Sequence, residues 1–217
     1  MKSLKHTYSF HFKDKVFLRS FISSFVILIV ALIISFYANV YATKVASQPV
    51  TDIILSNIRV YDVDWIFVYG FWIFCIFITV LGILKPYRVP FAVKSIALFV
   101  IIRAVFISLT HIGPFPGQDL LSTSKFVTDF TSGRDLFFSS HTGLPFLLAL
   151  MFWNHKPLRW LFIAISIFFG AIVLMGHLHY SIDVLAAPFI TYTIYHMAGV
   201  IFKKDKEMFE NGIRVRN

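Results

Sequence analysis

Six apolar stretches follow one another along the chain, separated by short polar segments. They cover residues 17–42, 65–84, 90–109, 141–153, 158–175 and 180–202. A helix needs about 20 predominantly apolar residues to cross a bilayer, so the stretch 141–153 is short and 158–175 barely long enough. The pattern predicts an all-α fold: a polytopic membrane protein whose residues 1–217 form a single six-transmembrane-helix bundle.

The composition agrees with this membrane class. Hydrophobic residues make up 58% of the chain and charged residues only 14%, whereas an ordinary soluble domain is about a quarter charged. The single cysteine, Cys75, lies inside an apolar stretch, so no disulfide can form within the chain. The net charge of +9 is better explained by basic cytoplasmic loops than by nucleic-acid binding.

Lysine and arginine gather in alternate polar segments, which predicts the orientation. They are Lys2, Lys5, Lys13, Lys15 and Arg19 near the start, Lys85, Arg88 and Lys94 in the second loop, Lys156 and Arg159 in the fourth, and Lys203, Lys204, Lys206, Arg214 and Arg216 in the tail. We therefore expect a cytoplasmic N-terminal stretch, 1–16, and a solvated, frayed cytoplasmic tail, 203–217. The third loop, 110–140, should face outward and could cover a site. The first apolar stretch is too long for a signal peptide and predicts a retained span.

A histidine and an aspartate, His179 and Asp183, stand four residues apart where the last apolar stretch begins. Positions i and i+4 share a helix face, so the carboxylate can bond one ring nitrogen and orient the other. This arrangement is typical of a nucleophilic histidine whose tautomer is held by an acid. The alternative is a structural pair at the membrane surface, although ionisable groups in membrane segments are usually functional.

A second histidine, His141, stands at the start of the fourth stretch, after Ser139 and Ser140, either of which could cap a helix. The predicted orientation puts His141 and His179 at the same outer surface. His141 can then serve as the acid and base for a leaving or attacking hydroxyl. Both histidines also stand at helix N-termini, whose N–H groups suit a phosphate. The plainer alternative is an interfacial histidine beside an ordinary cap.

Phosphate binding is assigned to Arg103, Asp135 and Ser140. Arg103 lies within the third apolar stretch, where a charge is costly, and a guanidinium can bind phosphate oxygens in pairs. The alternative is a buried ion pair with Asp183 or Asp135. Asp135 could instead position the loop or be a solvated carboxylate. No histidine spacing in the sequence is convincing as a metal site, so no metal is predicted.

These residues resemble the sphingomyelin synthase-related branch of the type 2 phosphatidic acid phosphatase superfamily. That family carries Gly-Asp-x-x-x-Ser-Gly-His-Thr in an outer loop and His-Tyr-(Ser/Thr)-x-Asp-Val at the start of its last helix. The corresponding segments here are Gly133-Arg134-Asp135-Leu136-Phe137-Phe138-Ser139-Ser140-His141-Thr142 and His179-Tyr180-Ser181-Ile182-Asp183-Val184. Arg103 followed by Pro114-Phe115-Pro116-Gly117 is also similar.

The chain departs from the family pattern at several positions. Ser140 replaces a glycine, and Arg134 separates Gly133 from Asp135. The arginine-rich stretch that ordinary lipid phosphatases place before their second histidine is missing, and His177 and Leu178 stand there. These differences favour the synthase-like branch.

The resemblance implies a lipid phosphotransferase that moves a phospho-head group between lipids through a phosphohistidine at His179, with His141 as acid and base and no cofactor. A phosphatase with water as acceptor uses the same residues and remains an alternative. A transporter or scaffold without catalysis is a third, but its polar residues would be spread along a path through the spans. The expected partners are lipid substrates and the bilayer. The expected location is a bacterial inner membrane, with the site facing the non-cytoplasmic side.

Overall fold

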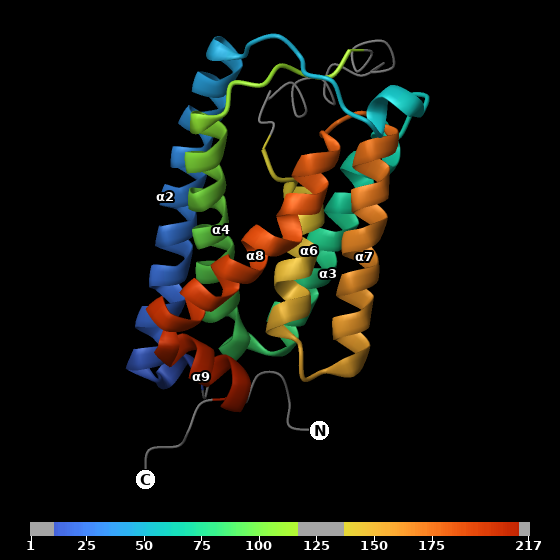
Figure 1. The fold of residues 1–217 in the computed structure, drawn as a ribbon. Helices are drawn as coiled ribbons and strands as arrows, with labels where there is room; N and C mark the ends of the chain where they lie inside the picture. Colours follow the sequence, from blue (N-terminus) through green and yellow to red (C-terminus); the bar gives the residue numbers. More distant parts are fainter. Residues whose placement is uncertain (1–10, 117–136, 213–217) are drawn as a thin grey trace.

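The computed structural model describes residues 11–116 and 137–212, and all regular elements in these ranges are helices (Figure 1). The apolar helices are α2 (Lys15–Val45), α3 (Phe71–Leu84), α4 (Val89–Leu109), α6 (Ser140–Met151), α7 (Lys156–Met175) and α8 (Ser181–Ile201). They run up and down the bundle in turn, so α6 and α8 both begin at the end where α2 and α4 finish (Figure 1). The all-helical prediction is confirmed for the described residues.

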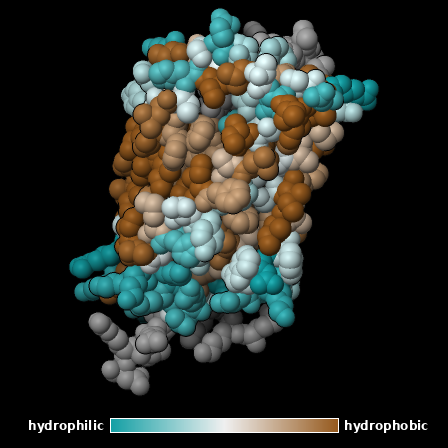
Figure 2. All heavy atoms as spheres, viewed as in Figure 1, coloured by the Kyte–Doolittle hydropathy of each residue, from teal (hydrophilic) through white to brown (hydrophobic). Residues whose placement is uncertain are grey.

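Five helical segments are long and apolar enough to cross a membrane, and α3 is one of them only together with the helical turn before it, as Ile66–Leu84. Helix α6, with 12 residues, is shorter. The molecule shows a brown apolar belt between hydrophilic ends, as expected of an integral membrane protein (Figure 2). Exposed aromatic residues stand near both ends of the helices: Trp65 and Tyr69 before α3, and Trp153 and Trp160 around the start of α7. Such residues favour membrane–water interfaces.

The segment before α3 is a π-helical turn, Ile66–Gly70, which the hydrophobic pattern could not reveal. A π turn is wider than an α turn and changes which side chains face inward; such turns are frequent at functional sites. Here Phe67 is buried, while Tyr69 is exposed. The continuing helix turns Phe71 and Phe74 toward Phe169 of α7.

Helix α6 lies between α7 and α8 and approaches both closely. A Cβ atom added at Gly143 would lie 2.7 Å from Phe99 Cε2 and 2.9 Å from Thr191 Oγ1, so a larger residue does not fit there. On the other side, Ser166 Oγ donates to the Thr142 carbonyl at 2.7 Å. The start of α6 is therefore held by contacts with three neighbouring helices.

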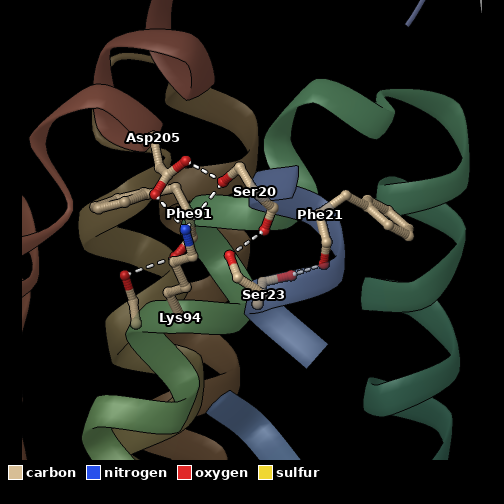
Figure 3. A network of polar contacts seen from close by, with 8 residues as sticks. Ser20, Phe21, Ser23, Phe91, Lys94 and Asp205 are labelled. Carbon is tan, nitrogen blue, oxygen red and sulfur yellow. Dashed lines mark hydrogen bonds and ion pairs between the residues drawn. The ribbon is translucent and has the colours of Figure 1, made fainter. Parts of the chain in front are cut away.

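Two details of the predicted cytoplasmic side are wrong. The tail is not frayed throughout, because Lys203–Asn211 forms helix α9, with Asp205 and Phe209 buried. Lys94 is not a loop residue: it is buried in α4, where its Nζ bonds Asp205 Oδ2 at 2.7 Å and Ser20 Oγ at 2.9 Å. Ser20 also bonds Asp205, so this network joins α2, α4 and α9 (Figure 3).

Candidate active site

The segments that carry His141 and His179 meet at one end of the bundle. The backbone N–H of Ser139, the N-cap of α6, donates to the carbonyl of Asp183 in the first turn of α8 at 3.1 Å. Ser139 also caps α6, because its Oγ accepts from the Thr142 N–H at 3.4 Å. The structure thus brings together two motifs that sequence reasoning placed at the same surface.

His179 and Asp183 are paired, although not as a helical i, i+4 pair. His179 precedes α8, whose N-cap is Tyr180, and its Nδ1 lies 3.3 Å from Asp183 Oδ2. The same oxygen accepts the Tyr180 N–H at 3.1 Å, which makes Asp183 part of a capping box. A carboxylate can only accept, so Nδ1 carries the proton and the lone pair lies on Nε2. Both residues are buried.

His141, in the first turn of α6, is enclosed by aromatic rings. Its ring centroid lies 4.0 Å from that of Phe67, 4.3 Å from Phe71 and 5.8 Å from Phe169. Among the described residues, none hydrogen-bonds the buried Nδ1 of His141. A buried polar atom normally has a partner, so this nitrogen is suited to a hydrogen bond with a ligand. His179 and Arg103 also lie near His141.

Arg103 is buried in α4 and contacts the segment that leads into α6. Its Nε donates to the carbonyl of Phe138 at 3.2 Å. Phe138 is itself buried, with its ring packed edge-on against Phe99 and Phe106 of α4. The guanidinium therefore contacts the residue immediately before Ser139, the cap of the helix that carries His141.

The N-terminus of α8 differs from the expectation of N–H groups available to a phosphate. The N–H of Tyr180 donates to Asp183, and that of Ser181 donates to Oδ2 of Asp52 at 2.7 Å. Asp52 belongs to the loop between α2 and α3, and sequence reasoning did not single it out. Burial acts to raise its pKa, but the N–H groups of Leu55, Ser181 and Ile54 donate to the carboxylate and together lower the pKa below its ordinary value.

Sequence reasoning assigned no role to Tyr180, which follows His179, or to His177, which lies two residues before it. The Tyr180 hydroxyl donates to the Gly113 carbonyl at 2.8 Å and accepts from the Val50 N–H at 3.2 Å. Burial raises the pKa of Tyr180, which keeps this hydroxyl protonated. His177 is buried with a left-handed φ of 52°, and burial lowers its pKa. The Tyr of the His-Tyr motif is the signal that could have identified Tyr180.

The remaining predicted residues are placed less fully. Ser140 is the first residue of α6 and is partly buried beside His141. Asp135 lies outside the described residues, as does most of the expected outer loop, 110–140. Within residues 11–116 and 137–212 no group of histidine, cysteine or acidic side chains could hold a metal ion.

A family model described as PAP2 superfamily C-terminal matches residues 133–200, which contain both histidine segments. This match supports the PAP2 superfamily, and with it an enzyme of the lipid phosphatase or phosphotransferase type that acts on lipids in a membrane. No curated protein and no solved structure matches the chain.

Proposed function

We propose that this protein is a membrane lipid phosphotransferase of the sphingomyelin synthase-like type, with His179 as nucleophile and His141 as acid and base. The observation that carries the proposal is the bond from Ser139 N–H to the Asp183 carbonyl, because it holds the two histidine segments side by side. The pairing of His179 with Asp183 supports it further, since it leaves Nε2 as the reactive nitrogen.

In the first step, His179 Nε2 attacks the phosphorus of a phospholipid. An N–P bond forms while the bond from phosphorus to the diacylglycerol oxygen breaks, and His141 gives a proton to that oxygen. Asp183 accepts the Nδ1–H bond and stabilises the positive charge that develops on the ring. The product is a phosphohistidine that retains the head group.

In the second step, the hydroxyl of another lipid loses its proton to His141, and its oxygen attacks the phosphorus. The N–P bond breaks and His179 is restored. Arg103 and the first turn of α6, including Ser140, are suited to stabilise the phosphoryl oxygens in both steps. Asp135 is proposed to position the head group.

The aromatic enclosure of His141 favours transfer over hydrolysis. Phe67, Phe71 and Phe169 cover the ring that must activate the acceptor, so water meets an apolar surface there. A lipid hydroxyl can arrive with its own apolar chain. The alternative is phosphatase activity, in which the same residues act and water is the acceptor.

We further propose six membrane crossings, with both termini cytoplasmic and the active site on the outer side. The start of α2 and helix α9 lie at the same end of the bundle, opposite the histidines, which fits an even number of crossings (Figure 1). The short α6 would make the fourth crossing.

The test uses purified protein in detergent micelles with a phospholipid labelled at its phosphate, together with diacylglycerol or ceramide. Label that moves to the added lipid, and does not in His179→Ala, supports the transferase and names its acceptor. Label released as free phosphate or a water-soluble ester makes the protein a hydrolase. If His179→Ala matches the wild type in both label transfer and label release, the catalytic proposal is wrong.

A further inference from the structure

The loop between α2 and α3 is bonded to the backbone on either side of the proposed nucleophile. Asp52 in this loop is 7% exposed, and its Oδ1 accepts the N–H groups of Ile54 and Leu55 at 2.8 and 3.0 Å. Its Oδ2 accepts the Ser181 N–H at 2.7 Å. One carboxylate thus closes the short helical turn Leu55–Asn57 and caps α8, which lies 129 residues further along the chain.

The same loop contacts Tyr180, the residue between His179 and Ser181. Its Val50 N–H donates to the Tyr180 hydroxyl, and its Leu55 packs with Tyr180 in a small buried cluster. Further along, the Tyr61 N–H donates to the Met175 carbonyl at 2.9 Å. The loop therefore covers the whole turn from the end of α7 to the start of α8.

This arrangement holds the two residues that follow His179 with two different carboxylates. The Tyr180 N–H is bonded to Asp183, and the Ser181 N–H is bonded to Asp52. Asp183 also contacts the His179 ring, so movement of the first turn of α8 would move the ring's orienting acid as well. The described part of the chain shows no lysine or arginine bonded to Asp52. A buried carboxylate is costly unless its hydrogen bonds, here from three backbone N–H groups and the Ser181 side chain, remain intact.

We propose that Asp52 is a positioning residue for the nucleophile: by bonding the Ser181 N–H from a separate loop, it fixes the first turn of α8 and hence the orientation of His179. This inference rests on the proposed role of His179 for its kinetic consequence, but the positioning can be measured without any reaction. Asp52 lies outside the residues matched by the family model.

The experiment compares the wild type, Asp52→Asn and Asp52→Ala in detergent micelles. The matched control is Asp62→Asn, a change at an exposed carboxylate of the same loop. Each protein reacts with diethyl pyrocarbonate, and peptide mass spectrometry gives the modification rates of His179 and of His155, which caps α7 at the opposite end of the bundle. We expect His179, buried in the wild type, to react several-fold faster in Asp52→Ala and less so in Asp52→Asn, with His155 unchanged.

Three results would overturn the positioning role: an unchanged His179 rate in both Asp52 variants, an equal rise at His155, which marks general loosening, or the same effect in Asp62→Asn. Activity then gives a second readout, in which Asp52→Ala lowers kcat by about tenfold or more with KM little changed. If the wild type shows no label transfer, the proposed function is wrong. The modification rates would still decide whether Asp52 positions His179.

Discussion

The N–H of Ser139 donates to the carbonyl of Asp183 at 3.1 Å, and this single bond joins the start of α6 to the start of α8. Ser139 caps the helix that carries His141, while Asp183 contacts His179 through its side chain. Asp183 therefore links the two histidine segments, through its backbone carbonyl to the cap of α6 and through its side chain to His179. A substitution of the Asp183 side chain leaves its backbone carbonyl in place, and it tests what the carboxylate does for the α8 cap and for His179.

Asp183→Asn should lower activity far more than stability. The Tyr180 N–H and His179 Nδ1 both contact the same oxygen, Oδ2, so an amide oxygen at this position retains the α8 cap and the tautomer with the lone pair on Nε2. The amide is neutral, however, and no longer stabilises the positive charge that develops on the His179 ring. By analogy with triads whose acid is replaced by its amide, we expect kcat to fall by about 10²- to 10⁴-fold.

The measurement is the rate of label transfer, with unfolding temperatures for both proteins. Asp64→Asn, at a partly buried carboxylate before α3, is the control and should retain activity. Equal rates in wild type and Asp183→Asn would mean that Asp183 only caps the helix.

Gly143→Ala should destabilise the protein and impair the site together. The new methyl group would meet Phe99 and Thr191 at less than 3 Å, and both are buried residues on neighbouring helices. Overpacking of this kind costs about 1–3 kcal/mol, and here it pushes on the turn that carries His141.

Gly199→Ala is the matched control, because its Cβ would meet the flexible end of Lys206 at 3.2 Å. It should be neutral or stabilising by up to about 1 kcal/mol, the usual gain of alanine over glycine in a helix. Thermal unfolding in micelles compares the two variants. Equal unfolding temperatures would show that α6 can move away from α4 and α8.

The helices could be predicted from the lengths of the apolar stretches. The common end of the bundle at which both histidines lie could be predicted from the alternation of basic and less basic loops. The role of Lys94 could not be predicted, because counting basic residues does not distinguish a lysine near the start of a helix from one in the loop before it. Its partner, Asp205, also lies 111 residues away in the sequence. The π turn that places Phe67 on His141 was hidden for a similar reason, since an apolar stretch has the same composition whichever way its helix is wound. Asp52 acts through a long-range cap, and its local sequence has no pattern that indicates α8.

Breaking the pair of Lys94 and Asp205 should destabilise the end of the bundle at which α9 lies. Both side chains are nearly buried, so Lys94→Met leaves a carboxylate with Ser20 as its remaining side-chain partner. Loss of one member of a buried pair typically costs about 3–5 kcal/mol, and replacement of both by apolar residues costs much less. The unfolding temperatures of the wild type and of the double variant Lys94→Met/Asp205→Leu should therefore both be higher than that of Lys94→Met. Exposed Lys203→Met is the control, and a loss as large as that of Lys94→Met would contradict the argument.

Asp52 should contribute a pH-dependent part of the stability. Its pKa in the folded protein is below the ordinary value of 3.8, so the contribution is fully present above about pH 4–5 and is lost as pH falls through the folded pKa. Asp52→Asn has no charge to titrate. The difference in unfolding temperature between wild type and Asp52→Asn should thus shrink as pH falls from 6 toward 3. A constant difference over this range would mean that hydrogen-bond geometry alone, without the charge, gives the effect.

Phe67→Ala should shift the reaction from transfer toward hydrolysis. Phe67 stacks on His141 at 4.0 Å between centroids, and removing its ring opens a space beside the proposed acid and base. Because this ring is buried, the variant should also lose about 3–5 kcal/mol of stability, so it must be compared at a temperature where it remains folded. The measured quantity is the ratio of water-soluble label to label on the acceptor lipid, which does not depend on the amount of folded protein.

Phe168→Ala, the control, removes an exposed ring of α7 and should leave the ratio unchanged. A Phe67→Ala ratio equal to that of the wild type would show that the aromatic enclosure does not select the acceptor, and access of the acceptor lipid would then have to be controlled elsewhere in the bundle.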